Sequence, residues 1–307
     1  MNLQLVLEQI LNGLQLGVML FLMAAGLTLV FGIMNLVNLA HGSLYMVGAY
    51  LATTFYRWTG SFVLGSLLAL PATLIVGVIV EVVALRTLYE RDHLDQVLAT
   101  FGLILFFNEL IAIIWGRVGL FTNLPQWLSG SLDFGGGFSY PLYRLLIVML
   151  GVAVALLLWY VVARTRIGML VRAGASNRMM VAALGVNIRL LYTLLFGFGA
   201  ALAGLAGAMA APIYAVQPGM GEQILIQVFV VIVIGGIGSI RGAFAGGIIV
   251  GAVDTLGRAF LKPALATLIS PTAAQAAGPA LASILIYLLM ALILALRPEG
   301  LFPARGH

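Results

Sequence analysis

Nine apolar stretches, each close to the length that crosses a lipid bilayer, limit what this sequence can fold into. They span residues 9–32, 37–56, 62–85, 96–116, 143–163, 191–213, 224–240, 243–261 and 279–297. Some are short or interrupted by glycine, so we expect about eight to ten crossings of about 20 residues each. Only helices or a closed barrel can pair their backbone groups inside lipid, and these stretches lack the period-two alternation of barrel strands. The predicted fold is an all-α bundle of transmembrane helices, with residues 1–307 forming a single domain.

The composition supports a membrane-embedded chain. Hydrophobic residues make up 63% of the sequence and charged residues only 8%, whereas a soluble domain carries about 25% charged residues. The chain has no cysteine, which excludes disulfides, thiolate metal sites and cysteine nucleophiles. His41, His93 and His307 are far apart and match no metal-ligand spacing, so no metal site is expected. The net charge of +5 is attributed to cytoplasmic loops and not to a nucleic-acid surface.

An arginine-rich segment predicts the orientation in the membrane. Residues 164–190 contain five arginines and no acidic residue, which is typical of a cytoplasmic loop. Alternating crossings then place ten basic residues inside and five outside. The inside set is Arg86, Arg91, Arg164, Arg166, Arg172, Arg178, Arg189, Arg241, Arg297 and Arg305, and the outside set is Arg57, Arg117, Arg144, Arg258 and Lys262. The N-terminus then lies outside, and residues 1–8 carry no Lys or Arg, so no cleavable signal peptide is expected there.

The same segment, 164–190, contains two short helix-forming runs. They cover residues 169–173 and 179–184, and Gly185 is placed to end the second. Methionine and other apolar residues mixed with arginine are typical of a helix that docks into a groove on a soluble partner. They are equally typical of a helix that lies on anionic lipid. The residues alone leave both interpretations open.

Closely spaced glycines predict a break in the helix near residue 236. Gly235, Gly236 and Gly238 are too many for one unbroken helix, because each costs about 1 kcal/mol relative to alanine. We expect a turn or broken helix here, with Arg241 anchoring it at the cytoplasmic face and Gly242 following. Small residues four apart, here and over 197–208, indicate close helix packing, which serves either plain compactness or sliding during transport.

Several polar residues lie in or beside the apolar stretches: Asn35, Asn38, His41, Asn108, Glu109 and Asp254. Ionisable groups in spans usually face the bundle interior. Asp254 and Arg258 are four residues apart, which predicts a local ion pair. Glu109 is expected near the outer end of its helix, where water reaches it. His41 is expected to be a hydrogen-bonded packing residue and not a proton relay.

The sequence shows no energy-converting or catalytic chemistry. It contains no Walker motif, no paired catalytic carboxylates and no Ser-His-Asp arrangement, so we expect no enzyme. Uphill transport would then need an ion gradient or a separate subunit. One alternative is a stand-alone ion-coupled carrier or channel, with Glu109, Asp254 and His41 as its charge pathway. A membrane-embedded enzyme is a third reading, for which no nucleophile or metal constellation is found.

Four blocks of sequence carry a resemblance to a known family. They are residues 26–50 (with the turn AHG), 199–212, 228–253 and the RPEGLF tail at 297–302. Together the blocks resemble the permease subunits of the branched-chain amino acid class of ABC importers, specifically the first of their two paralogous permeases. The resemblance covers nearly the whole chain.

The resemblance implies roles for particular residues. It implies that residues 164–190 couple the membrane subunit to an ATPase, a role carried onto Gly168, Arg172, Ala173, Asn177 and Gly185. Here the chain reads GMLVRA where the family commonly has GRAxRA. The family's N-terminal turn is carried onto Asn38, His41 and Gly42.

The resemblance also implies partners and a mechanism. The partners are a second permease subunit, two ABC ATPase subunits that bind ATP and Mg²⁺, and an extracytoplasmic substrate-binding protein. No cofactor is expected on this subunit. The implied location is the bacterial inner membrane, and the implied mechanism is alternating access. The solute is a branched-chain amino acid or a related small polar compound, and the sequence does not decide which.

Overall fold

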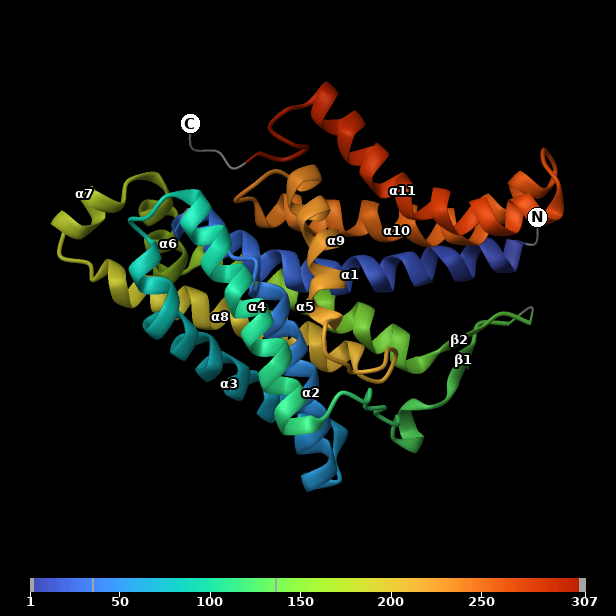
Figure 1. Ribbon diagram of the computed structural model, residues 1–307, viewed down its shortest axis with the longest axis horizontal. Coiled ribbons are helices and arrows are strands. Elements are labelled where there is room, and N and C mark those ends of the chain that lie inside the picture. Colours follow the sequence, from blue (N-terminus) through green and yellow to red (C-terminus); the bar gives the residue numbers. More distant parts are fainter. Residues whose placement is uncertain (1–2, 35, 136, 304–307) are drawn as a thin grey trace.

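The computed structural model describes residues 3–34, 36–135 and 137–303 and is built almost wholly of helices (Figure 1). Asn35, Arg305 and His307 lie outside the described residues. The α-helices are α1 (Leu3–Met34), α2 (His41–Thr59), α3 (Phe62–Val80), α4 (His93–Trp115), α5 (Leu142–Arg164), α6 (Arg166–Ser176), α7 (Arg178–Ala183), α8 (Ile188–Ala210), α9 (Met220–Gly235), α10 (Ile240–Ala266) and α11 (Pro271–Leu296). The shorter elements are the π-helix η1 (Glu81–Leu85), the 3-10 helices η2 (Arg86–Leu88) and η3 (Gln126–Leu128), and the strands β1 (Ser131–Asp133) and β2 (Ser139–Pro141).

The predicted helix bundle is confirmed. Each of the nine apolar stretches corresponds to one helix, and α6 and α7 lie between the fifth and sixth. In the described part of the chain, seven helices are long and apolar enough to cross a membrane. The other two are α2, which is less apolar, and α9, which has only 16 residues. The one departure from an all-α chain is an antiparallel hairpin, in which Leu132 of β1 pairs with Tyr140 of β2.

The connections gather at two opposite ends of the molecule (Figure 1). The hairpin end contains the start of α1, the β1–β2 hairpin and residues 60–61, 116–130, 211–219 and 267–270. The α6–α7 end contains α6, α7 and residues 36–40, 86–92, 236–239 and 297–303. Leu120 and Val216 form a β-bridge at the hairpin end, and the rings of Tyr89 and Tyr192 meet at 5.5 Å at the other. Consecutive long helices therefore run in opposite directions, as the arginine distribution predicts.

Polar residues at helix ends explain where several helices start. The side chain of Ser61 accepts a hydrogen bond from the Leu64 amide at the start of α3, and Ser239 accepts one from Gly242 at the start of α10. Such caps satisfy amides that have no partner inside the helix. The last predicted stretch, 279–297, begins too late. The helix α11 begins two turns earlier, where Ser270 accepts a hydrogen bond from the Ala273 amide and Pro271 occupies the first turn.

The centre of the bundle is α1, which is the most buried of the long helices and packs against α10, α8, α5 and α9. Beside it, α2 packs against α3, α8 and α9. Glycines allow these close contacts. A Cβ added to Gly48 of α2 would overlap the Cα of Gly204 in α8, so neither position has room for a side chain. The same close approach brings Gly17 of α1 against Gly247 of α10. These contacts confirm that the small-residue spacing marks close helix packing.

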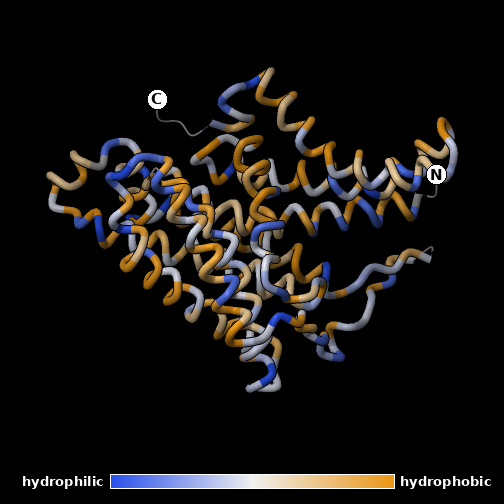
Figure 2. Tube along the Cα trace, in the orientation of Figure 1, coloured by the Kyte–Doolittle hydropathy of each residue, from blue (hydrophilic) through white to orange (hydrophobic). Residues whose placement is uncertain are grey.

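The outer surface of the bundle is apolar. Figure 2 shows hydrophobic residues along the long helices, with many of the hydrophilic ones in the connections and in the first half of α1. Large apolar side chains of α4 stand exposed, including Ile113 at 79%. Water would not tolerate so much continuous apolar surface, whereas lipid tails solvate it. The exposed faces of α4 and α11 are therefore expected to contact lipid.

Candidate functional site

The first candidate region is the pair of short helices α6 and α7, which lies where the sequence predicts a cytoplasmic segment. The Thr165 side chain accepts a hydrogen bond from the Gly168 amide at 3.2 Å and starts α6. Asn177 ends α6, and its Oδ1 accepts from the Met180 amide at 3.0 Å, which starts α7. Gly185 follows α7 with φ +86°. Its amide bonds the Ala182 carbonyl, a Schellman-type ending that confirms the predicted stop.

Of the five residues carried over from the family, Gly168, Arg172 and Ala173 lie within α6, and Asn177 and Gly185 follow α6 and α7. Gly168 is buried, and an added Cβ would overlap the Val161 and Val162 carbonyls. Arg172 is exposed, yet its guanidinium donates a hydrogen bond back to the Val162 carbonyl. Ala173 is half-buried, and its carbonyl accepts from the Asn177 amide.

The exposed side of α6 and α7 carries large apolar residues among arginines, while the inner side packs on the bundle. Gly174 faces Ile33 of α1 and Leu191 of α8. On the other side Met169, Met179 and Leu184 are 56%, 78% and 79% exposed. Ile167 and Met180 are exposed as well. We call these five residues the apolar surface of α6 and α7. Exposed apolar side chains in such number are expected to be covered by a partner protein or by lipid.

The predicted glycine turn is confirmed, although three of its five residues lie in the flanking helices. α9 ends at Gly235, and Gly236 and Gly238 adopt φ +103° and +80° in the turn. Arg241 and Gly242 belong instead to the first turn of α10 because Ser239 caps that helix. Arg241 is exposed at the α6–α7 end, as predicted. Gly235 and Gly242 face each other, and a Cβ on either would overlap the carbonyl of the other.

The C-terminal tail closes this turn. The amides of Leu301 and Phe302 donate to the carbonyls of Ile234 and Gly235, both at 2.9 Å. These are among the carbonyls that a helix end leaves without partners. A Cβ added to Gly300 would lie 2.6 Å from the Gly236 backbone, so the RPEGLF tail fits only through its own glycine.

The third predicted group, Asn38, His41 and Gly42, lies where α1 passes into α2. Asn38 is buried in the turn, and its Oδ1 accepts from the Ala40 amide at 3.0 Å. His41 and Gly42 are not in the turn but are the first two residues of α2. The His41 ring is fully buried, with Nε2 3.2 Å from the Met23 carbonyl, which confirms a hydrogen-bonded packing role. Gly42 faces Gly221 of α9 so closely that no side chain fits.

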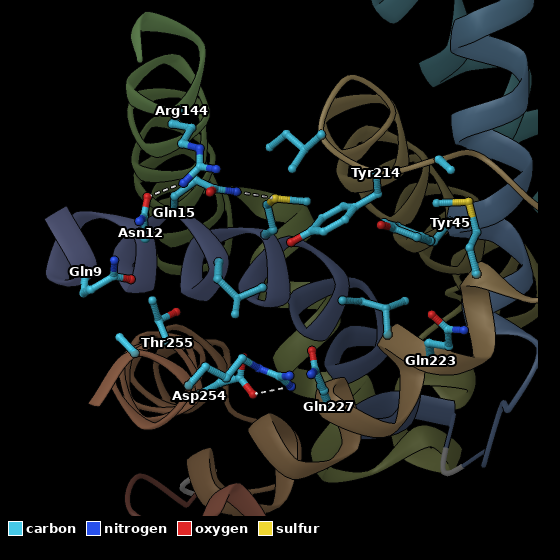
Figure 3. A pocket seen from close by; sticks show the side chains of 18 of the residues that line it. Gln9, Asn12, Gln15, Tyr45, Arg144, Tyr214, Gln223, Gln227, Asp254 and Thr255 are labelled. Atoms are coloured by element: carbon cyan, nitrogen blue, oxygen red, sulfur yellow. Dashed lines mark hydrogen bonds and ion pairs between the residues drawn. The ribbon is translucent and has the colours of Figure 1, made fainter. Parts of the chain in front are cut away.

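An open cavity of about 900 Å³ lies between α1, α2, α5, α9 and α10 in the half of the molecule nearer the hairpin end (Figure 3). Six amide side chains line it: Gln9, Asn12, Gln15, Gln217, Gln223 and Gln227. Its charged residues are Arg144, Asp254 and Arg258. Lipid cannot satisfy so many polar groups, so water, a solute or a partner must fill this cavity.

Sequence analysis missed most of this cavity. It predicted the Asp254–Arg258 ion pair, which is confirmed, with two hydrogen bonds of 2.9 Å. It overlooked the amides because none is ionisable. A helical signal was nevertheless present, since Gln9 and Asn12 are three residues apart on α1 and Gln223 and Gln227 are four apart on α9. Residues at these spacings share one face of a helix.

Sequence analysis also missed a buried acidic group at the α6–α7 end. Glu81 is fully buried in η1 and forms an ion pair with Arg86 at 3.0 Å. The hydroxyls of Tyr89 and Thr193 donate to the same carboxylate at 2.6 and 2.8 Å. Burial and the hydrogen bond to Glu81 raise the pKa of Tyr89, so this hydroxyl stays protonated as a donor. Through Thr193 the cluster ties the end of α3 to α8.

Two further polar residues of the prediction, Asn108 and Glu109, have hydrogen-bond partners. Glu109 is exposed and pairs with Arg117 at 2.8 Å, as expected for a position that water reaches. Asn108 bonds the Glu222 carboxylate and the Gly219 amide, joining α4 to the start of α9. Within the described ranges, no group of three or more His, Asp or Glu side chains is placed to hold a metal ion.

Comparison with known proteins identifies the family. The family model described as branched-chain amino acid transport system / permease component matches residues 9–294. The chain is 31% identical to the high-affinity branched-chain amino acid transport system permease protein BraD of Pseudomonas aeruginosa, over 96% of this chain and 95% of that protein. It is also 31% identical to the permease protein LivH of Escherichia coli, over 83% and 87% of the two chains. No solved structure matches the chain significantly. The chain is thus a multi-pass membrane protein that belongs to the branched-chain amino acid permease family of ABC transport systems.

Proposed function

We propose that this chain forms the translocation path of an ATP-driven importer for branched-chain amino acids or closely related solutes. Its partners are a second permease subunit, two ABC ATPases and an extracytoplasmic binding protein, in a bacterial inner membrane. ATP and Mg²⁺ bind to the ATPases, and this subunit holds no cofactor of its own. The proposal draws on family membership and on the printed names of the relatives.

One structural observation carries the proposal: the exposed apolar surface of α6 and α7. Soluble proteins and lipid both cover such surfaces. Side-chain caps start both α6 and α7, and a short connection leads from α7 into α8, which packs on α1, α2 and α3. A displacement of α6 and α7 would therefore move α8 and the helices that pack against it. We assign this surface to the ATPase, with Gly168, Arg172, Ala173, Asn177 and Gly185 shaping it.

The mechanism that fits this arrangement is alternating access. The binding protein delivers solute at the hairpin end. Closure of the ATPases on ATP moves α6–α7, and the long helices rock against one another. The glycine contacts between α9 and α10 lie beside the α6–α7 end, where an inward exit must open. The residues at this contact are Gly235 and Gly242, with Gly236, Gly238 and Arg241 beside them.

The charges of the bundle do not favour an ion-coupled carrier. Among the described residues, the two buried acids are Glu81 and Asp254, and each is held by an arginine. A carrier coupled to protons or sodium needs an acid that exchanges its partner during transport. Ion pairs that stay closed, as these two do in the structure, do not supply such an exchange.

Reconstitution tests the proposal. Proteoliposomes that contain the permease pair and the two ATPases, with binding protein outside and ATP inside, are expected to accumulate radiolabelled leucine. Accumulation should stop without ATP or without the ATPases and should persist when ionophores collapse ion gradients. Accumulation by the permease alone, driven by an imposed proton or sodium gradient, would contradict the proposal.

A further inference from the structure

The cavity between α1, α2, α5, α9 and α10 contains an arginine, Arg144, that forms no ion pair with a carboxylate of the described residues. Arg144 bonds the neutral side chain of Asn12 (Figure 3), and Tyr140 bonds the same Asn12 oxygen at 3.2 Å. No carboxylate of the described residues lies within ion-pair distance of Arg144. Arg258 is different, because its charge is matched by Asp254. The cavity as a whole therefore carries one excess positive charge, which favours an anionic group.

The charged groups of the cavity come from different helices and line the same space. Tyr214, at the α8–α9 connection, sits among them: burial raises its pKa, Arg144 and Arg258 lower it, and Asp254 raises it. Tyr214 lines the same cavity as all three charged residues. Arg144 comes from α5 and Asp254 from α10, so a molecule between these helices meets a guanidinium that has no ion-pair partner on one side and a carboxylate on the other (Figure 3).

Apolar side chains complete the lining. Leu16 and Met19 of α1, Ile213, and Met220 and Ile224 of α9 line the same cavity. Water alone would not account for these apolar side chains in the lining. A purely apolar solute would not account for the charged and amide side chains. The combination fits a small molecule that has a charged head and an aliphatic tail.

We propose that this cavity binds an aliphatic amino acid as a zwitterion during transport. The carboxylate pairs with Arg144, because a guanidinium presents parallel N–H donors that match a carboxylate. The ammonium approaches Asp254, whose oxygens keep lone pairs for further donors beside the two bonds from Arg258. The amides hold the water that remains. This inference rests on the proposed function and adds a solute site within the permease itself.

Cysteine protection tests the site directly, because the chain has no cysteine of its own. Thr255→Cys places one thiol in the cavity lining. In membrane vesicles that hold the assembled transporter, millimolar leucine is expected to slow reaction of this thiol with a methanethiosulfonate reagent. Leucinamide, which lacks the carboxylate, and 4-methylpentanoate, which lacks the ammonium, should protect much less. The exposed Ser129→Cys, outside the cavity, serves as the control that no compound protects.

Charge variants then assign the contact to Arg144. Arg144→Gln in the Thr255→Cys chain is expected to raise the leucine concentration for half-protection about tenfold or more, since charge-assisted hydrogen bonds have this strength. Arg144→Lys should retain part of the protection because it keeps the charge. Arg57→Gln is the matched control, an exposed arginine at the hairpin end outside the cavity, and should leave protection unchanged.

The outcomes separate this inference from the proposed function. Equal protection by leucine and leucinamide, or protection that survives Arg144→Gln, overturns the zwitterion site. A thiol at residue 255 that never reacts, and a second thiol at Ala259→Cys that also never reacts, shows that a neighbouring subunit fills the cavity and overturns it too. If either of these results is obtained but the same vesicles take up leucine when ATP is supplied, the proposed function is still supported and only the solute site is wrong. Absence of ATP-driven uptake by the unaltered transporter overturns the function itself.

Discussion

Individual glycines decide how closely the helices of this bundle approach. Gly48 faces the backbone of Gly204, which cannot move aside as a flexible side chain can. Gly102 in α4 has no heavy atom within 4 Å of its added Cβ. Both are mid-helix glycines, so their intrinsic helix propensities are the same. Any difference between alanine substitutions at these positions therefore reports packing.

Alanine at these two glycines is expected to act in opposite directions. Gly48→Ala should cost about 1–3 kcal/mol because it overpacks the α2–α8 contact. Gly102→Ala should gain up to about 1 kcal/mol from helix propensity alone. The measurement is the apparent Tm of the purified permease in one detergent. A fall for Gly102→Ala as large as that for Gly48→Ala would refute the proposed packing.

At the level of elements, the Glu81 cluster clamps the end of α3 to α8. Glu81→Gln removes the negative charge to which Arg86, Tyr89 and Thr193 all donate hydrogen bonds. Because the substitution leaves the Arg86 charge without its partner, the apparent Tm should fall clearly. Glu109→Gln is the matched control, because its ion pair with Arg117 is exposed and contributes little. Equal effects of the two substitutions would show that Glu81 does not clamp the helices.

The α7 helix allows a test of docking that does not disturb folding. Met179 and Met180 are 78% and 64% exposed, so Met179→Asp combined with Met180→Asp should leave the apparent Tm of the isolated permease unchanged. The same double substitution should lower ATP-driven uptake at least about tenfold if an apolar groove on the ATPase binds the two methionine side chains. Leucine at both positions should preserve uptake. Full uptake with both aspartates would remove α7 from the coupling surface.

At the scale of the whole molecule, the two ends are expected to face opposite compartments. Single cysteines at Ala175 of α6 and Ser129 of the hairpin end are both exposed and have no native thiol to compete with. An impermeant maleimide added to intact cells should label Ser129→Cys at once and Ala175→Cys only after the cells are opened. Labelling of Ala175→Cys from outside would reverse the orientation and contradict ATPase docking.

Much of this architecture follows from the sequence alone. The apolar stretches determined the number and the rough limits of the long helices, because lipid leaves a chain few other ways to satisfy its backbone. The positive φ of Gly185 and Gly236 and the Asp254–Arg258 pair were also predictable, since each depends on residues within one turn of one another. Such local interactions need no knowledge of the rest of the fold.

The tertiary structure decided everything that depends on which helices become neighbours. Gly48 and Gly102 look alike in sequence, and only packing makes one of them irreplaceable. The Glu81 cluster joins residues 112 positions apart, and the cavity brings Arg144 near Asp254 from two different helices. In lipid, any apolar face suits any other about equally well. Helix limits are therefore local properties, whereas the choice of partner helices, and with it the solute cavity, exists only in the assembled bundle.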